Sequence, residues 1–389
     1  MTADGRTQEG SEFLLEAREL QPRLHELMRR FVEVESPSGD VEANHRVATV
    51  FQMALEARGM TVARRPAPGY GEHLVARLPL EGAPSDARPV LVLGHMDTVH
   101  PLGTLSTLPF EHRGEMLRGP GVFDMKGGWA CFLAALDLLA ARGSAPSAPL
   151  LVLVTSDEEV GSPTSRTLIE EAGRSSRACL VLEPSLPGGA VKIRRKGTGE
   201  GILTVTGKAA HAGIEPEAGA SAIHEMAHQI LAVTALADPE RETHVNVGLV
   251  RGGTGANVVA ARAEASVDFR FWTREEAERL EAAMASLAPV DPRCTVRLEG
   301  GVNRLALEPS PGSEALYATA RALAAEMGME LGSGGTGGAS DGNLTAAVGC
   351  PTLDGLGPEG GGAHSQDEHV LVDRLPHRVA LLARLLERV

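Results

Sequence analysis

Short apolar runs that end abruptly in polar residues recur along the first half of the chain. The segments 90–95 (VLVLGH), 150–155 (LLVLVT) and 178–184 (ACLVLEP) have the pattern of buried strands, and each leads into acids or a histidine. Between the first two, the segment 127–143 is strongly apolar and predicts a buried helix. Apolar strands that alternate with helices are typical of an α/β layer with a largely parallel sheet.

Amphipathic and capping patterns predict the other helices of this layer. The spacing of apolar residues predicts a helix over 12–31. Asp40 is a candidate N-cap for a second helix, which Gly59 closes. Ser162 and Pro163 resemble an N-cap followed by a proline in the first helical turn, so the next long helix is expected to begin there.

The pattern changes near Val191. From about 198 to 299 the order is strand, helix, strand, strand, helix, strand, with helices near 219–236 and 273–287. This is the split βαβ, ferredoxin-like order, and it predicts a compact inserted α+β domain. Helix and strand alternation resumes after about 305 and ends in a helix over 373–388. We therefore expect one domain built from residues 1–191 and 305–389, with residues 192–304 inserted in it.

Composition and charge exclude several classes of protein. The formal net charge of -14 argues against a nucleic-acid binder, which needs a basic face to neutralise phosphates. No segment is long and apolar enough to predict a membrane span, and the first 20 residues lack the pattern of a signal peptide. The four cysteines have no CxxC spacing, so we expect buried free thiols in a reducing cytoplasm.

Candidate metal ligands follow the predicted strands. Ligands of α/β sheets lie beyond the carboxyl ends of the strands, and three strands here lead into His95 and Asp97, into the acids 157–159, and into Glu183. Asp124 precedes a helix, and His364 lies in a glycine-rich loop. Each feature alone is usually a hydrogen-bonded or solvated group, but five of them at one edge favour a metal site. Imidazoles with carboxylates suit zinc, and less often manganese or cobalt.

An ordered set of motifs carries a family resemblance over nearly the whole chain. LVLGHMDTVHP, GPGVFDMKGG, VTSDEEVGS, LEP, GKAAHAG, GGASDGN and GGGAHSQDE occur in the order found in the M20 family of zinc peptidases and deacylases. The resemblance implies a zinc-exopeptidase-type catalytic domain with a mostly parallel sheet. It also implies that the ferredoxin-like insert acts as a lid and as the interface of a homodimer.

The resemblance implies two zinc ions per chain, with cobalt or manganese as alternatives. His95 would bind one ion together with Glu183. His364 would bind the other together with Glu159. Asp124 would bridge both ions.

Further residues of the same motifs match the family's catalytic groups. Asp97 matches the carboxylate that orients the imidazole of His95. Glu158 matches the general base that takes a proton from the attacking water. The family often has a cis peptide after the bridging aspartate, so Asp124–Met125 is a candidate for one.

The resemblance also assigns four residues of the inserted domain. His211 matches the lid histidine that stabilises the oxyanion of the tetrahedral intermediate, often in the partner subunit. Asn257 matches a lid residue that contacts substrate. Arg270 and Arg304 match positions that hold the substrate carboxylate, a task that suits a guanidinium.

The first hypothesis is a cytoplasmic, dimeric, two-zinc hydrolase of small peptides that cleaves next to a C-terminal amino acid, as glutamate carboxypeptidases do. The alternative within the same chemistry is a deacylase of N-acyl amino acids. A binding protein without catalysis is a third hypothesis, although it does not need Glu158. A nucleotide-binding protein that uses GSGGTGGASDG is disfavoured, because this segment lacks the Lys-Ser/Thr ending of a phosphate loop.

Overall fold

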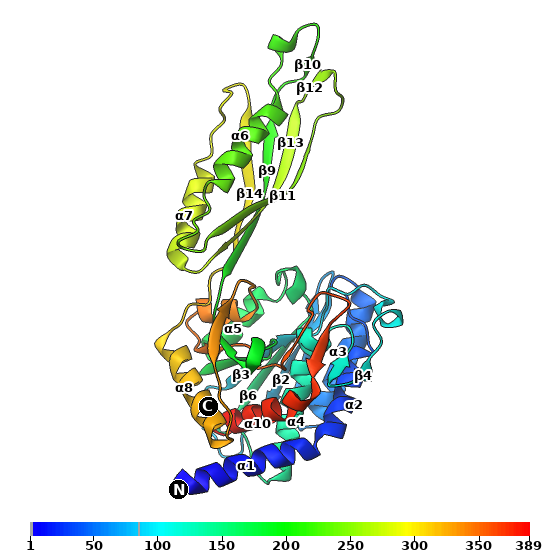
Figure 1. The fold of residues 1–389 in the computed structure, drawn as a ribbon, viewed down its shortest axis with the longest axis vertical. Helices are drawn as coiled ribbons and strands as arrows, with labels where there is room; N and C mark the ends of the chain where they lie inside the picture. The colour runs from blue at the N-terminus through cyan, green and yellow to red at the C-terminus, as the bar shows by residue number, and fades with distance from the viewer. Residues whose placement is uncertain (1–2, 85) are drawn as a thin grey trace. The chain divides into compact units, whose positions relative to one another are not determined.

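The computed structural model describes residues 3–84 and 86–389, which divide into two compact units (Figure 1). Unit 1 comprises the described residues up to Ile193, Pro309–Gly335 and Ser340–Val389. Unit 2 comprises Arg194–Glu308 and Thr336–Ala339. Within the described ranges, no helix has both the length and the apolar character needed to cross a membrane.

A six-stranded sheet organises unit 1. Its order is β1-β2-β6-β3-β7-β16. The four strands from β6 to β16 run parallel, whereas β1 and β2 pair antiparallel at one edge. The strands are β1 (Thr61–Ala67), β2 (Gly71–Leu78), β3 (Val90–His95), β6 (Leu150–Thr155), β7 (Ala178–Val181) and β16 (Thr352–Leu353). The prediction of an α/β fold with a largely parallel sheet is confirmed.

Helices cover both faces of this sheet. Successive residues of a strand point to opposite faces, and in the central strands the residues on both faces are apolar. Val90 and Val92 belong to one core, with α1 (Ala3–Glu19), α2 (Gln21–Val32), α3 (Val41–Glu56), α4 (Gly127–Ala141), α8 (Pro311–Glu326) and α10 (Leu375–Leu386). Leu91 and Leu93 belong to the other core, with α5 (Arg166–Ser175) and α9 (Gly342–Ala347). All four cysteines are buried free thiols.

Two predicted helix boundaries were wrong. The helix expected over 12–31 is two helices, α1 and α2, which meet at Leu20. Pro22 explains the break, since proline has no N–H to donate and is tolerated only in the first turn of a helix. The helix expected to begin at Ser162 begins at Arg166, and Ser162 itself has a left-handed φ of 59°. By contrast, Asp40 caps α3 as predicted and accepts a hydrogen bond from the N–H of Ala43.

A smaller antiparallel sheet carries the C-terminal glycine-rich loop. Its order is β17-β18-β5-β4, with β17 (Gly360–Gly361), β18 (His369–Leu371), β5 (Met116–Arg118) and β4 (Glu111–Arg113). Short helical turns complete unit 1: η1 (Thr104–Ser106), η2 (Val122–Lys126), η3 (Glu158–Val160), η4 (Pro187–Gly189) and η6 (Val372–Arg374). Strands β8 (Val191–Arg195) and β15 (Ser333–Thr336) lie where the chain passes between the units.

Unit 2 is an antiparallel four-stranded sheet with two helices, in the order β11-β13-β9-β14. Along the chain it reads β9 (Gly197–Thr206), α6 (Ala222–Thr234), β11 (His244–Gly252), β13 (Arg262–Phe271), α7 (Arg274–Ala285) and β14 (Thr295–Arg304). A short hairpin of β10 (Ala210–His211) and β12 (Val258–Val259), and the turn η5 (Pro216–Ala218), extend it. This is the predicted alternation of strands and helices.

One face of the unit 2 sheet packs on the helices. The apolar residues of β13, such as Phe269 and Phe271, join the core formed with α6 and α7. The residues between them, including Arg270, point to the opposite face because side chains alternate along a strand. That opposite face therefore carries the polar residues of the sheet.

Candidate metal centre

The parallel strands of unit 1 bring the predicted ligands to one edge. His95 is the last residue of β3 and pairs with Thr155, the last residue of β6. Glu158 and Glu159 follow β6, and Glu183 follows β7. Asp124 arrives from η2, just before α4, and His364 comes from the loop after β17. Segments far apart in sequence thus meet at the carboxyl ends of the strands.

Two groups of side chains share Asp124. Nε2 of His95 lies 3.3 Å from Oδ1 of Asp124 and 3.4 Å from Oε1 of Glu183. Nε2 of His364 lies 3.6 Å from the other oxygen of Asp124, Oδ2, and 3.2 Å from Oε2 of Glu159. Each oxygen of Asp124 therefore faces a different imidazole. This pairing is the one expected of a carboxylate that bridges two ions.

The orientation of His95 suits metal binding. Its Nδ1 lies 2.9 Å from the backbone carbonyl of Asp97, so Nδ1 is the donor and the neutral ring keeps a lone pair on Nε2. That lone pair faces Asp124 and Glu183. The Nε1 group of Trp129 donates to the carbonyl of His95 at 2.9 Å and fixes the backbone behind the ring.

Two buried atoms in the cluster fit a cation as their missing partner. Among the described residues, Nε2 of His95 and Oε1 of Glu159 are buried and make no hydrogen bond. Unpaired buried polar atoms are costly, and carboxylate and imidazole donors are what zinc prefers. Three carboxylates, of Asp124, Glu159 and Glu183, with two neutral imidazoles carry a charge near -3, which two divalent ions would offset. The residues therefore fit a dinuclear metal site.

With protein groups alone, the cluster retains protons. Burial acts to lower the pKa of His95, but the carboxylates of Asp124, Asp97 and Glu183 outweigh it and raise that pKa well above its usual value. Asp124 and Glu159 raise the pKa of His364 to about 10. Burial raises the pKa of the Glu159 carboxyl. Burial also opposes ionisation of Asp124, but the imidazoles of His364 and His95 hold its pKa below the usual range.

Comparison with known proteins identifies the family of this chain. The sequence profile of Peptidase family M20/M25/M40 matches residues 91–388. The chain belongs to this family. It is 31% identical over 376 residues to carboxypeptidase G2 of Pseudomonas sp. (strain RS-16), covering 94% of this chain and 89% of that protein. It is 33% identical over 303 residues to succinyl-diaminopimelate desuccinylase of Delftia acidovorans, covering 73% of this chain and 78% of that protein.

The fold agrees as well. The crystal structure of aminopeptidase PepT from Bacillus cereus superposes with a TM-score of 0.76 at 22% identity and covers 94% of this chain and 98% of that one. The predicted resemblance to the M20 family is thus confirmed, and the chain is an M20 metallohydrolase.

The three consecutive acids after β6 have separate surroundings in this M20 chain. Both oxygens of Asp157 are buried and accept hydrogen bonds from the N–H and hydroxyl groups of Thr164 and Ser165. These hydrogen bonds hold residues 162–165 as a turn, so α5 begins only at Arg166. Oxygens of Glu158 and Glu159, in contrast, lie in groups with His95 whose atoms are within 4.8 Å of one another.

Asp97 holds this acidic turn in place. Its buried carboxylate accepts the hydroxyl of Ser38 at 2.6 Å and the N–H groups of Glu158 and Glu159, each at 3.3 Å. The carboxylate lies 3.5 Å from Nδ1 of His95, while the carbonyl of the same residue takes the hydrogen bond of the ring. Asp97 therefore connects the strand end of His95 to the loop that carries both glutamates.

Glu368 is a site residue that the sequence did not reveal. Its fully buried carboxylate accepts the N–H groups of Gly121, Phe123 and Asp124, each at 2.9 Å, and lies 2.6 Å from Nε2 of His100. It thereby fixes the loop that presents Asp124, where the peptide bond to Met125 is cis, as the resemblance implied. The sequence signal that could have identified Glu368 is its place as the last residue of the motif GGGAHSQDE, where no role was assigned to it.

Two glycines allow close packing beneath the cluster. A Cβ atom on Gly128 would lie 2.1 Å from the carbonyl oxygen of Leu182, next to Glu183. A Cβ atom on Gly94 would lie 2.3 Å from the side chain of Met125. At Gly128 the contact is with backbone, so only glycine lets α4 approach the end of β7 this closely, whereas the flexible end of Met125 could move away from a side chain at position 94.

The predicted lid residues lie in unit 2. His211 ends β10 and is exposed, and its strand pairs with β12 directly after Asn257. The N–H of Ala212 donates to the carbonyl of Asn257 at 2.9 Å, so these two segments lie side by side. Nδ1 of His211 accepts the N–H of Gly213 at 3.1 Å, so the neutral ring carries its proton on Nε2.

Arg270 and Arg304 flank one residue of β9. Both pair with Thr198, from β13 on one side and β14 on the other. Arg270 is half-buried and forms an ion pair with Asp268 at 2.7 Å, while Arg304 is buried. Unit 2 therefore places the two arginines on either side of one strand, opposite the same residue.

Proposed function

We propose that this chain is a two-zinc hydrolase that cleaves an amide or peptide bond next to a free C-terminal amino acid, as a glutamate carboxypeptidase does. The observation that carries the proposal is the division of Asp124 between two groups of ligand atoms, with His95 on one oxygen and His364 on the other. Similarity to carboxypeptidase G2 over 94% of the chain supports the peptidase activity. Cobalt or manganese are alternatives to zinc.

His95, Glu183, His364 and Glu159 would hold the two ions, with Asp124 between them. When bound, the ions would polarise the carbonyl of the substrate and make a water molecule more acidic. Glu158 would take the proton from that water and deliver it to the leaving nitrogen. Its place suits this task, because its carboxylate lies beside His95 and Glu183 and its backbone N–H is held by Asp97.

Unit 2 would supply the recognition of the substrate. The Nε2–H of His211 would donate to the oxyanion of the tetrahedral intermediate, and Asn257 beside it would contact the substrate. Arg270 and Arg304 would hold the free carboxylate, which a planar guanidinium binds with two parallel hydrogen bonds. We propose that unit 2, which is the inserted domain, acts as a lid.

Unit 2 also supports the proposal of a homodimer. Strand β11 is at the edge of its sheet, and its Leu249 and Val250 are each 60% exposed. On α6, Ile223 and Leu231 are exposed as well. An open strand edge beside exposed aliphatic side chains favours pairing with a second chain.

Four buried free thiols favour a reducing compartment such as the cytoplasm.

A deacylase of N-acyl amino acids is the second candidate function, and the 33% identity to succinyl-diaminopimelate desuccinylase favours it. A hydrolysis screen of zinc-reconstituted protein separates the two. We expect turnover of folyl-glutamate or dipeptides. Turnover of N-acetyl-ornithine or N-succinyl-diaminopimelate without any cleavage of peptides would reject the carboxypeptidase activity.

A further inference from the structure

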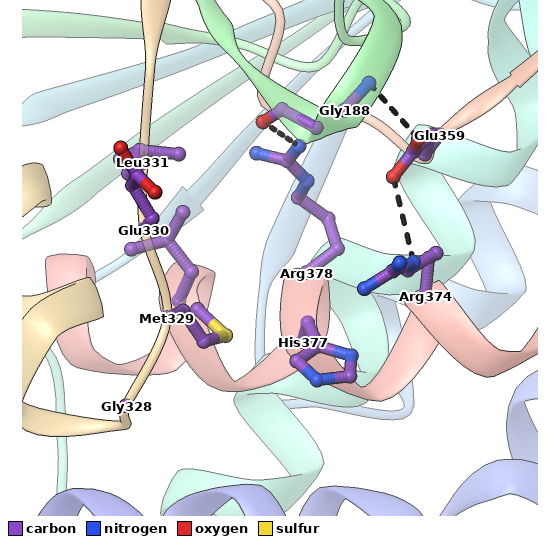
Figure 2. Close-up of a pocket in the computed structure, with 11 residues that line it drawn as sticks. Gly188, Gly328, Met329, Glu330, Leu331, Glu359, Arg374, His377 and Arg378 are labelled. Carbon is purple, nitrogen blue, oxygen red and sulfur yellow. Dashed lines mark hydrogen bonds and ion pairs between the residues drawn. The ribbon is translucent and has the colours of Figure 1, made fainter.

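One cavity of unit 1 lies apart from the ligand cluster. It has a volume of about 310 Å³ and is lined by η4, the segment 328–331 and one side of α10 (Figure 2). None of the candidate metal ligands lines it. Arg378 reaches into this cavity from α10, and its side chain is the feature that needs a partner.

Arg378 is 5% exposed and its guanidinium is only partly satisfied. Nη2 donates to the carbonyl of Gly189 at 2.8 Å, whereas Nη1 is buried and has no hydrogen-bond partner. In Figure 2 this free nitrogen points towards the segment with Met329 and Leu331. Burial lowers the pKa of Arg378 to about 10, so the group keeps its charge at neutral pH.

Another buried arginine of the same helix shows how this chain normally compensates such a charge. Arg384 is fully buried and lies within 3.1 Å of carboxylate oxygens of Glu9, Glu326 and Glu387. No carboxylate within the described ranges lies within 4 Å of the Arg378 guanidinium. A buried charge without a counter-ion at ion-pair distance is costly, so an anion bound beside Arg378 would be stabilising.

The acids in the cavity wall compensate this charge only in part: Glu359 acts to raise the pKa of Arg378 from beyond ion-pair distance. Glu359 accepts the N–H of Gly188 at 3.0 Å and lies 3.8 Å from Nε of Arg374, so it is committed to other partners. Glu330 is exposed. Met329, Leu331 and Leu381 add apolar surface beside the guanidinium.

We propose that this cavity binds a small oxyanion, of the carboxylate or phosphate class, through Nη1 of Arg378. The apolar side chains beside it would accept the short carbon chain of an organic acid, and the cavity volume is in the range of small-molecule sites. A charge-assisted hydrogen bond from a guanidinium is the contact that best recognises such an oxygen. The proposal is independent of the hydrolytic activity, because it concerns binding and none of the catalytic residues.

Thermal unfolding and calorimetric titration of the zinc-loaded protein in a chloride buffer test this site. Acetate, butyrate and phosphate are the probes, and acetamide is the neutral match for acetate. We expect saturable binding of at least one oxyanion with a rise in melting temperature, and no response to acetamide. The three anions also distinguish a carboxylate ligand from a phosphate ligand.

Three variants assign the binding to Arg378. Arg378→Met should weaken this binding about tenfold or more and should melt no lower than the original protein in chloride, because it replaces a buried charge that has no ion-pair partner. Arg378→Lys, which keeps the charge, should bind more weakly than the original but more tightly than Arg378→Met. Arg388→Met, at an exposed position after the same helix, should bind as the original does.

Anions that bind to the zinc ions affect all variants alike, so only the difference between Arg378→Met and Arg388→Met counts. Equal responses of these two variants would overturn the proposal. An absence of any response to the three anions in the original protein, which would mean that a water molecule satisfies Nη1, would overturn it as well.

Discussion

The carboxylate of Glu368 accepts the backbone N–H of Asp124 at 2.9 Å, although 244 residues separate the two along the chain. It holds the N–H groups of Phe123 and Gly121 in the same way. Asp124, which would bridge two metal ions, therefore lies in a loop whose conformation is fixed by Glu368. Glu368 acts on the site through Asp124 and is a positioning residue.

Replacement of Glu368 by glutamine should weaken metal binding about 10- to 100-fold, because the amide removes the charge that organises the Asp124 loop. Competition with a zinc chelator measures this affinity. Asp367→Asn is the matched control, since the side chain of Asp367 is 91% exposed. Equal zinc affinity of the two variants would show that Glu368 does not position Asp124.

Replacement of Glu158 by glutamine should leave zinc bound and lower kcat by about 10²- to 10⁴-fold, because a general base is lost while the ligands remain. Mass spectrometry of the metal content and steady-state kinetics measure the two effects together. Glu171→Gln, at an exposed position, should change neither. Unchanged turnover in Glu158→Gln would remove this residue from the mechanism.

Asp157 should matter for stability and little for chemistry. Its buried carboxylate accepts four hydrogen bonds from Thr164 and Ser165, so Asp157→Asn should lower the free energy of unfolding by about 2–4 kcal/mol. Urea unfolding measures this loss, and Asp373→Asn at an exposed position is the control. A loss of zinc at full stability would instead place Asp157 in the metal site.

The stability of chelator-treated protein should fall as the pH rises from about 6.5 to about 10. Asp124 and Glu159 raise the pKa of His364 to about 10, above its ordinary value near 6.5. The imidazolium therefore stabilises the fold fully below about pH 6.5, and this contribution is lost as the pH rises through the raised pKa. Zinc needs the neutral ring, so zinc affinity should rise over the same interval.

Urea unfolding and zinc titration at several pH values between 6.5 and 10 measure both trends. His364→Gln lacks the titrating ring and should show a smaller dependence on pH in each. A dependence as steep in His364→Gln as in the original protein would assign the effect to other groups.

Local patterns were sufficient to predict much of this fold. The apolar runs of β3, β6 and β7 and the cap at Asp40 depend on residues a few positions apart, which a sequence displays directly. The ligand candidates were recognisable because they follow those strands. The break at Leu20 depends on Pro22 and could have been predicted from it.

Long-range bonding explains what was missed. The start of α5 depends on a buried Asp157 that takes the hydrogen bonds a helix cap would have used. The role of Glu368 depends on contacts to residues about 245 positions away, and such contacts leave no periodicity. Whether a buried arginine has a carboxylate partner likewise depends on distant segments: Arg384 pairs with Glu326, whereas Nη1 of Arg378 has no hydrogen-bond partner.

The number of metal ions per chain, measured after zinc reconstitution in the original protein and in His364→Ala, tests the central claim most directly. Two ions are predicted for the original protein, since Asp124 faces two separate imidazoles. One ion is predicted for His364→Ala, because the group of His95, Asp124 and Glu183 remains intact. One ion in the original protein, or the same number in both, would contradict the two-metal site.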